Sequence, residues 1–206
     1  MNKKFIKNNY VVVRKAVSKD ICQFVSDYFM LKRQVSQRLH EKKMIGEDNL
    51  GWGNFGDQQV PFTYFHYSDI AMEILLMKMK PIIEKEIGTE LVPTYSYSRA
   101  YETGDILGRH KDRYSCEVSA TLNLYQDHKW PIYLEPSGKV NKDGIPVDLD
   151  QGDLMIYRGE KVEHWREAYF GNFCVQVFLH YNIKGTQRAE ENKFDKRPFL
   201  GVPHGC

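Results

Sequence analysis

The interpretation of this chain turns on one stretch, Arg99-Ala-Tyr-Glu-Thr-Gly-Asp-Ile-Leu-Gly-Arg-His-Lys-Asp112. Near its end, an imidazole and a carboxylate, those of His110 and Asp112, stand two positions apart. In an extended segment, side chains at i and i+2 point to the same face, so both groups can reach one ion. Imidazole and carboxylate are both ligands of divalent transition metals. The spacing therefore predicts two of the ligands of a metal site.

A third ligand has to come from elsewhere in the chain, and His164 is the best candidate. It follows the strand-like run Gly152-Asp153-Leu154-Met155-Ile156-Tyr157. Two histidines and one carboxylate on one face of an octahedron form the facial triad of non-heme Fe(II) oxygenases. A His-x-Asp pair alone is weak evidence, because the chain contains 7 histidines. The sheet-rich stretch between the pair and the later histidine strengthens the prediction.

After Gly88 the chain consists mainly of short strand-like runs separated by turns. Many short strands with few helices are typical of a sandwich or barrel. We therefore predict a mainly β (α+β) fold and a single domain over residues 1–206, with a core at about 91–183 and a surface tail at 184–206. The predicted strands of that core are Leu91–Tyr101, Glu117–Tyr125, Pro131–Leu134, Val147–Leu149, Asp153–Tyr157 and Phe173–Tyr181.

Before Gly88, a strand at Tyr10–Val13 is followed by two predicted helices and an intervening loop. Ser18 caps the first helix, which runs to about Gln37, and Ser68 or Asp69 caps the second, which Pro81 kinks or restarts. Glycine and aromatic residues fill 46–66, and this loop either packs at the rim or closes over a substrate. The apolar residues predicted to face inward are Ile21, Phe24, Val25, Tyr28, Phe29 and Leu31, then Ile70, Ile74, Leu75, Met77 and Ile82.

Composition excludes several classes of partner and location. The net charge is +2, from 29 basic and 27 acidic residues, so there is no strong electrostatic case for nucleic acid or an anionic membrane. The best membrane candidate, Ile70–Ile83, is too short and is interrupted by charges and a proline. The four cysteines form no Cys-x-x-Cys pair. We expect a cytoplasmic protein with reduced thiols, and the sequence carries no signal for an oligomeric state.

These motifs together resemble the 2-oxoglutarate/Fe(II)-dependent dioxygenases, and in particular the prolyl 4-hydroxylase-like branch. The resemblance covers most of the chain, including the N-terminal strand and helix and the segment from Tyr97 to Tyr181. It is carried by Tyr101-x-x-Gly104 leading to His110-x-Asp112, by the run that begins at Gly152, and by His164-Trp-Arg-Glu-Ala-Tyr and Gln176-Val-Phe-Leu-His-Tyr181.

The resemblance implies a fold, a reaction and a set of cofactors. The fold would be a double-stranded β-helix (jelly roll) with supporting N-terminal helices. The catalytic and metal-binding residues would be His110, Asp112 and His164, which would hold Fe(II). 2-Oxoglutarate would chelate the metal and be decarboxylated to succinate with O2, which drives hydroxylation of a peptide (prolyl) or small-molecule substrate. Ascorbate would serve as an accessory reductant.

One position departs from the family pattern. The distal carboxylate of 2-oxoglutarate needs a cation, which in this branch lies about ten residues after the second histidine, where this chain has Phe173 and Cys174. Substitutes are predicted among other polar residues. We rank Tyr101 first and Arg166 and Arg99 next, although each arginine could equally be a solvated surface charge, and Gln176 could donate a neutral hydrogen bond. These cofactor-binding candidates are Tyr101, Arg166, Arg99 and Gln176.

Three further readings stay open at this point. A non-catalytic, cupin-like metal- or ligand-binding protein is the main alternative, because the usual cation is missing from the last strand. A nucleic-acid demethylase ranks lower, since Gly171–Tyr181 lacks arginine and the charge is near neutral. In the strand Glu117–Tyr125, polar Thr121 and Asn123 alternate with leucines, and we favour a solvent-facing position for them over a place in the site.

Overall fold

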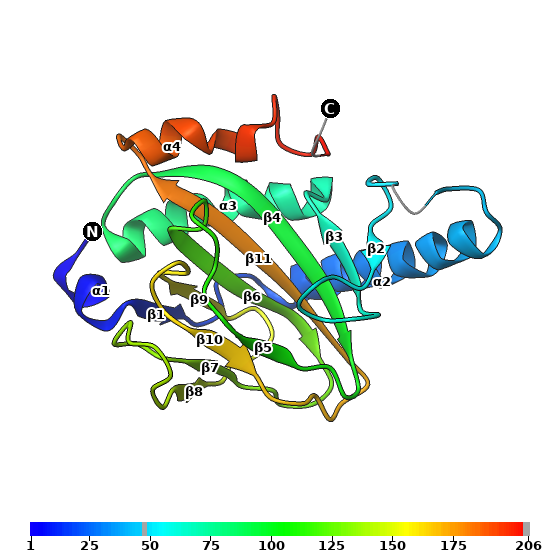
Figure 1. Ribbon diagram of the computed structural model, residues 1–206, viewed down its shortest axis with the longest axis horizontal. Coiled ribbons are helices and arrows are strands. Elements are labelled where there is room, and N and C mark those ends of the chain that lie inside the picture. The colour runs from blue at the N-terminus through cyan, green and yellow to red at the C-terminus, as the bar shows by residue number, and fades with distance from the viewer. Residues whose placement is uncertain (47–48, 204–206) are drawn as a thin grey trace.

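The computed structural model describes residues 1–46 and 49–203, and most of its strands lie in two antiparallel sheets (Figure 1). In the large sheet the strand order is β1 (Tyr10–Val13), β9 (Leu154–Tyr157), β6 (Val118–Gln126), β11 (Phe173–Ile183), β4 (Leu91–Glu102), β3 (Tyr64–Tyr67) and β2 (Asn54–Phe55). In the small sheet the order is β5 (Leu107–His110), β10 (His164–Arg166), β7 (Ile132–Leu134) and β8 (Ile145–Val147).

From β4 onward the chain passes repeatedly from one sheet to the other. The strands β4, β6, β9 and β11 belong to the large sheet, whereas β5, β7, β8 and β10 belong to the small one. Strands that are consecutive in the sequence are thus mostly separated in space, and the space between the two sheets is lined by both. The mainly β fold predicted from the sequence is confirmed.

Two long helices cover the other face of the large sheet and form the apolar core with it. These helices, α2 (Lys19–Glu41) and α3 (Ile70–Ile87), lie behind the sheet in Figure 1. Ser18 caps α2 by accepting a hydrogen bond from the backbone of Ile21, and Asp69 caps α3. A short helix, α1 (Lys3–Asn8), precedes β1. The core between helices and sheet includes Phe29, Leu76, Ile83, Leu122 and Val177.

The predicted inward faces of the helices are partly wrong. Val25, Phe29 and Leu75 are buried, but an opposite stripe on each helix is exposed. Both helices carry apolar residues on more than one face, so periodicity alone does not decide which face meets the sheet. Pro81 lies inside α3 without restarting it. The predicted inward residues that are in fact exposed are Ile21, Phe24, Leu31, Ile70, Ile74 and Met77.

The glycine and aromatic segment is more regular than its composition suggests. Residues 54–67 contain the hairpin β2–β3, and β3 pairs with β4 at the edge of the large sheet. Gly53 and Gly56 have positive φ angles, of 75° and 79°, which permit the turns on either side of β2. The segment therefore extends the sheet before it approaches the space between the sheets. Residues 47 and 48 of the loop lie outside the described residues.

The C-terminal segment packs against the sheet through buried polar contacts. It contains α4 (Gln187–Glu191) and the 3₁₀ turn η1 (Lys193–Lys196). Arg197 is buried and donates hydrogen bonds to Glu73 (2.7 Å) and to the carbonyl oxygen of Thr94 (3.1 Å). Asp195 accepts a hydrogen bond from Arg113 (2.6 Å). Within the described ranges, no helix has the length and apolar character that a membrane crossing requires.

Candidate active site

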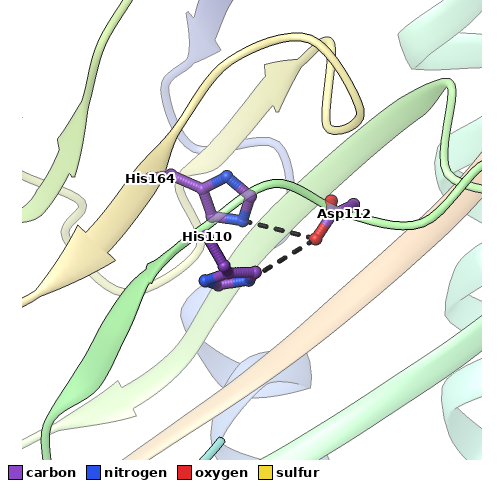
Figure 2. Close-up of side chains that lie close together, drawn as sticks. All are labelled: His110, Asp112 and His164. Carbon is purple, nitrogen blue, oxygen red and sulfur yellow. Dashed lines mark ion pairs between the residues drawn. The ribbon is translucent and has the colours of Figure 1, made fainter. Parts of the chain in front are cut away.

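The three predicted metal ligands lie together at the edge of the space between the sheets. β5 and β10 are adjacent, and their register places His110 directly opposite His164. Asp112 follows β5 by two residues and turns back toward both rings (Figure 2). Its Oδ1 atom is 3.6 Å from Nε2 of His110 and 3.4 Å from Nε2 of His164. The pairing of two short strands thus brings residues distant in sequence to one point.

Backbone carbonyl groups fix the orientation of both imidazoles. Nδ1 of His110 donates to the carbonyl oxygen of Gly108 (2.8 Å), and Nδ1 of His164 donates to that of Val162 (3.2 Å). Because a carbonyl oxygen only accepts, each Nδ1 carries a proton, and each Nε2 is the ring nitrogen available to a metal. This is how metal-binding histidines are usually held. Both Nε2 atoms therefore point toward Asp112, on the side where a cation would be held.

Asp112 is held as a carboxylate by its surroundings. Its Oδ2 accepts a hydrogen bond from Ser119 (2.6 Å), and its backbone N–H donates to Gly159 (3.0 Å). Burial raises the pKa of Asp112, but His164 and His110 outweigh that effect and hold the pKa well below its usual range. An ionised carboxylate beside two imidazoles is a donor set that suits a divalent cation.

A cavity of about 350 Å³ opens beside the three ligands. The large sheet contributes an aromatic wall, and residues 57–59 of the segment after β2 form part of the rim. Arg99 lies in this wall and pairs with Asp57 at the rim. The residues that line the cavity are Asp57, Gln58, Gln59, Tyr95, Tyr97, Arg99, Leu107, His110, Asp112, Tyr157, His164, Phe178 and His180.

Known proteins resemble this chain in structure but not detectably in sequence. No family model and no curated protein matches it. AviO1 from Streptomyces viridochromogenes Tue57 superposes with a TM-score of 0.64 at 13% identity, covering 89% of this chain and 94% of AviO1. A Pseudomonas putida prolyl-4-hydroxylase superposes with a TM-score of 0.59 at 14% identity, covering 88% and 96% of the two chains.

A third similar structure is HygX from Streptomyces hygroscopicus with nickel and 2-oxoglutarate bound. Its TM-score is 0.59 at 11% identity, and the match covers 90% of this chain and 88% of HygX. A 2OG-Fe(II) oxygenase-family protein from Burkholderia pseudomallei also superposes, at 12% identity with a TM-score of 0.51, over 66% of this chain and 70% of its own. This chain has the fold of the 2-oxoglutarate/Fe(II) oxygenases. At these identities the likeness establishes the fold alone.

The oxygenase fold buries all four predicted cofactor-binding residues on the inner face of the sheets. Tyr101 and Gln176 have no exposed surface, and Arg99 and Arg166 are each 1% exposed. The surface-charge reading of the two arginines is therefore wrong. Arg99 also donates a hydrogen bond to the Tyr101 hydroxyl (3.1 Å). Of these four residues, only Arg99 lines the cavity.

Arg166 is the buried cation whose charge lacks a counterion in this oxygenase fold. It lies two residues after His164 on β10 and donates one hydrogen bond, to the carbonyl oxygen of Trp130. Its Nε and Nη2 atoms have no hydrogen-bond partner, and no carboxylate pairs with it within the described residues. Burial lowers the pKa of its guanidinium, and nearby Cys174 and Tyr101 oppose that shift. Such an orphaned cation indicates an absent anion.

Sequence reasoning missed several residues of the site. Ser119, Thr121 and Asn123 have no exposed surface, so the solvent-facing position favoured for that polar face of β6 is wrong. The structure also places His180 in the cavity wall, with a hydrogen bond to Ser119 (3.0 Å). The alternation of polar residues along β6 was the available signal, because an inner polar face and an outer one have the same period.

The residues present fit Fe(II) and 2-oxoglutarate. His110, Asp112 and His164 offer two imidazole nitrogens and a carboxylate oxygen within 4.8 Å of one another. That donor set suits iron with open positions. The orphaned guanidinium of Arg166 supplies a charge for the distal carboxylate of the cosubstrate.

Proposed function

We propose that this protein is an Fe(II)- and 2-oxoglutarate-dependent dioxygenase that hydroxylates its substrate. The observation that carries the proposal is the convergence of His110 Nε2, His164 Nε2 and Asp112 Oδ1 beside a cavity. The carbonyl groups bind the proton of each Nδ1, so each Nε2 is the ring nitrogen that remains for a metal. When bound, Fe(II) and 2-oxoglutarate supply oxygen activation and the transfer of one oxygen atom to a C–H bond, with release of succinate and CO2.

The arrangement of the strands supports the finer description of the fold. We infer that β4 to β11 are the eight strands of a double-stranded β-helix (jelly roll), since they fall into two facing sheets of four by passing repeatedly between them. β1, β2 and β3 then extend the large sheet at its edges. We also retain the proposal of a single catalytic domain over 1–206, with its core at 91–183.

We assign the distal carboxylate of 2-oxoglutarate to Arg166, with help from Tyr101. Residues i and i+2 of a strand face the same side and are about 7 Å apart, so Arg166 lies one five-carbon dicarboxylate away from His164 on the same face. The two unpartnered guanidinium nitrogens can form the bidentate pair that a carboxylate prefers. Tyr101 lies in this region as well, because its ring packs on Trp130 (4.8 Å between centroids) and the Arg166 guanidinium lies over the same Trp130 ring (4.6 Å).

In this scheme the residues of the chain have three tasks: they bind the metal, orient the cosubstrate and exclude water. His110, Asp112 and His164 would hold the metal, and the cavity beside them would admit cosubstrate and substrate. Arg166 and Tyr101 orient the cosubstrate by its far end. The aromatic wall, with Tyr95, Tyr97 and Phe178, limits water around the reacting centre.

The size of the cavity bears on the substrate class. About 350 Å³ is at the low end of small-molecule sites and must accommodate cosubstrate as well as substrate. We therefore infer that a single side chain or ring enters, as from a peptide (prolyl) or a small molecule. HygX has been solved with hygromycin B bound, which shows that the fold accepts a small molecule. The non-catalytic, cupin-like alternative was based on the missing cation of the last strand. Arg166 offers a buried cation on another strand, β10, so that reason no longer applies.

The test is to add Fe(II), ascorbate and 2-oxoglutarate to the purified protein and measure succinate. We expect a metal-to-cosubstrate absorption band without oxygen and slow succinate formation with it. His110→Ala should abolish both, because one imidazole ligand is lost, whereas His40→Ala, on the distant end of α2, should leave both unchanged. If His110→Ala binds Fe(II) and 2-oxoglutarate as well as the wild type, the proposed function is wrong.

A further inference from the structure

The two oxygens of the Asp112 carboxylate have different surroundings. Oδ1 faces both histidine Nε2 atoms, at 3.6 and 3.4 Å. Oδ2 points the other way and accepts a short hydrogen bond from the Ser119 hydroxyl (2.6 Å). Ser119 comes from β6 in the large sheet, so it holds the carboxylate from a different sheet than the one that carries the histidines.

The single hydrogen of the Ser119 hydroxyl fixes the direction of the hydrogen bonds that link His180, Ser119 and Asp112. A hydroxyl has one hydrogen, and Ser119 gives it to the ionised Asp112. Its oxygen therefore accepts from Nδ1 of His180, which is 3.0 Å away. His180 lies opposite Ser119 in the register of β11 and β6, and its ring packs on Tyr95 at 4.5 Å. Since the only hydrogen of the Ser119 hydroxyl is given to Asp112, Nδ1 of His180 carries the proton of this contact.

The backbone at Gly159 packs closely against the contact between Ser119 and Asp112. A Cβ atom added at Gly159 would lie 2.2 Å from Asp112 Oδ2 and 2.3 Å from Ser119 Oγ. The same glycine accepts the backbone hydrogen bond of Asp112 (3.0 Å). The missing side chain thus allows the loop before β10 to press directly on the Ser119–Asp112 contact and hold it in place.

We propose that His180 and Ser119 form a positioning relay that keeps Asp112 monodentate toward the metal. The inference rests on the proposed function. A carboxylate that turned to bind through both oxygens would occupy a position that the two donor atoms of 2-oxoglutarate or O2 require. Ser119 holds Oδ2 away from the metal, and His180 holds the Ser119 hydroxyl in the donating orientation. Ser119 and His180 are positioning residues, because neither touches the metal.

The test measures Fe(II) affinity without oxygen, by competition with a coloured chelator, and then 2-oxoglutarate affinity by the absorption band. Ser119→Ala should weaken Fe(II) binding by about tenfold or more, the range for loss of a partner that orients a metal ligand. Ser119→Thr keeps the hydroxyl and should stay within about threefold of the wild type. His180→Phe keeps a ring without Nδ1 and should weaken binding, whereas His180→Asn keeps an N–H near Nδ1 and should restore it.

The double variant Ser119→Ala/His180→Phe separates a relay from two independent structural roles. If His180 acts through Ser119, the double variant binds Fe(II) as Ser119→Ala does. The relay is overturned if the two effects multiply, if Ser119→Ala binds Fe(II) and 2-oxoglutarate as the wild type does, or if His180→Asn is no better than His180→Phe.

A measurement on the wild type needs no folded variant. ¹⁵N NMR of the protein loaded with diamagnetic Zn²⁺ and 2-oxoglutarate should show the His180 proton on Nδ1, and a proton on Nε2 alone would overturn the relay. Failure of the proposed function is distinguishable, since the wild type would then give no band with Fe(II) and 2-oxoglutarate. If the wild type binds Fe(II) and 2-oxoglutarate and the Ser119 and His180 variants bind them equally well, the relay is refuted and the proposed function is not.

Discussion

Arg99 and Arg166 are two buried arginines with opposite electrostatic surroundings. Each has 1% of its surface exposed, and both influence the hydroxyl of Tyr101. Arg99 pairs with Asp57 from the cavity rim, so its charge is already compensated. Arg166 has no such partner within the described residues, and two of its nitrogens make no hydrogen bond. The difference favours Arg166 as the residue that would bind an anion. Arg99 instead binds Asp57 and so holds the segment at the cavity rim.

Removal of Arg166 should produce the largest effect. Arg166→Gln leaves the distal carboxylate of 2-oxoglutarate buried and unpaired, which costs about 2 kcal/mol or more and raises its Kd about 30-fold or more. The Kd of Arg166→Lys for 2-oxoglutarate should lie between those of the wild type and Arg166→Gln, because an ammonium group keeps the charge but lacks the planar fork of a guanidinium. The measurement is a titration of the Fe(II)-loaded protein with 2-oxoglutarate by the absorption band. Fe(II) affinity itself should change little.

Matched variants sharpen this comparison. Arg38→Gln removes an arginine whose side chain is 78% exposed on α2 and should leave the Kd unchanged. If Arg99→Gln raises the Kd about 30-fold while Arg166→Gln does not, the roles of the two arginines are reversed, and Asp57 must move aside for the cosubstrate.

Asp57→Asn tests the role of Arg99 and should lower the free energy of unfolding. It leaves the Arg99 guanidinium buried with only neutral partners, Tyr101 and Gln59. The expected loss is about 1–3 kcal/mol of unfolding free energy, below the cost of breaking a fully buried pair, because the Asp57 side chain is 20% exposed. Urea unfolding measures it. Gln58→Glu, on the same segment, is the control, and an Asp57→Asn variant as stable as the wild type would show that the pair contributes nothing.

The Asp57 contribution should depend on pH in one direction only. Burial raises the pKa of Asp57, but Arg99 and the Tyr97 hydroxyl outweigh it, so the folded pKa lies below the usual value. A depressed pKa stabilises the fold above the unfolded value of about 3.9, and the contribution disappears as the pH falls through the folded pKa. The stability difference between wild type and Asp57→Asn should thus be constant from pH 6 to 8 and shrink below about pH 4. A difference that grows on acidification would contradict this.

The grouping of the candidate metal ligands could be predicted from the sequence, because side chains two positions apart in a strand share a face. His110 and Asp112 stand two apart in an extended segment, and the structure places them with His164 as expected. Their pairing partners could not be predicted. Ser119 and His180 meet through the register of β6 and β11, a long-range feature that no local pattern specifies.

The candidate cosubstrate-binding residues show the same limit. The sequence singled out Tyr101, Arg166, Arg99 and Gln176 but did not distinguish a buried cation from a surface one. That distinction depends on which acid reaches each arginine. Asp57 meets Arg99 across the segment that begins after β2, and no carboxylate meets Arg166 within the described residues. The helix faces failed for a related reason, since α3 carries apolar residues on both its buried and its exposed side.

The smallest expected effect concerns Cys174, which lies beside Arg166. Burial raises the pKa of this thiol to about 11, with Arg166 acting in the opposite direction, so the thiol is protonated and enclosed at pH 8. In a Cys206→Ser background, reaction with a disulfide reagent should require local opening, and bound 2-oxoglutarate should slow labelling of Cys174 severalfold. Cys22, in the helix-facing core, is the internal control and should not respond. Equal slowing of Cys174 and Cys22 would show that 2-oxoglutarate stabilises the whole fold. It would then give no support for cosubstrate binding next to Arg166.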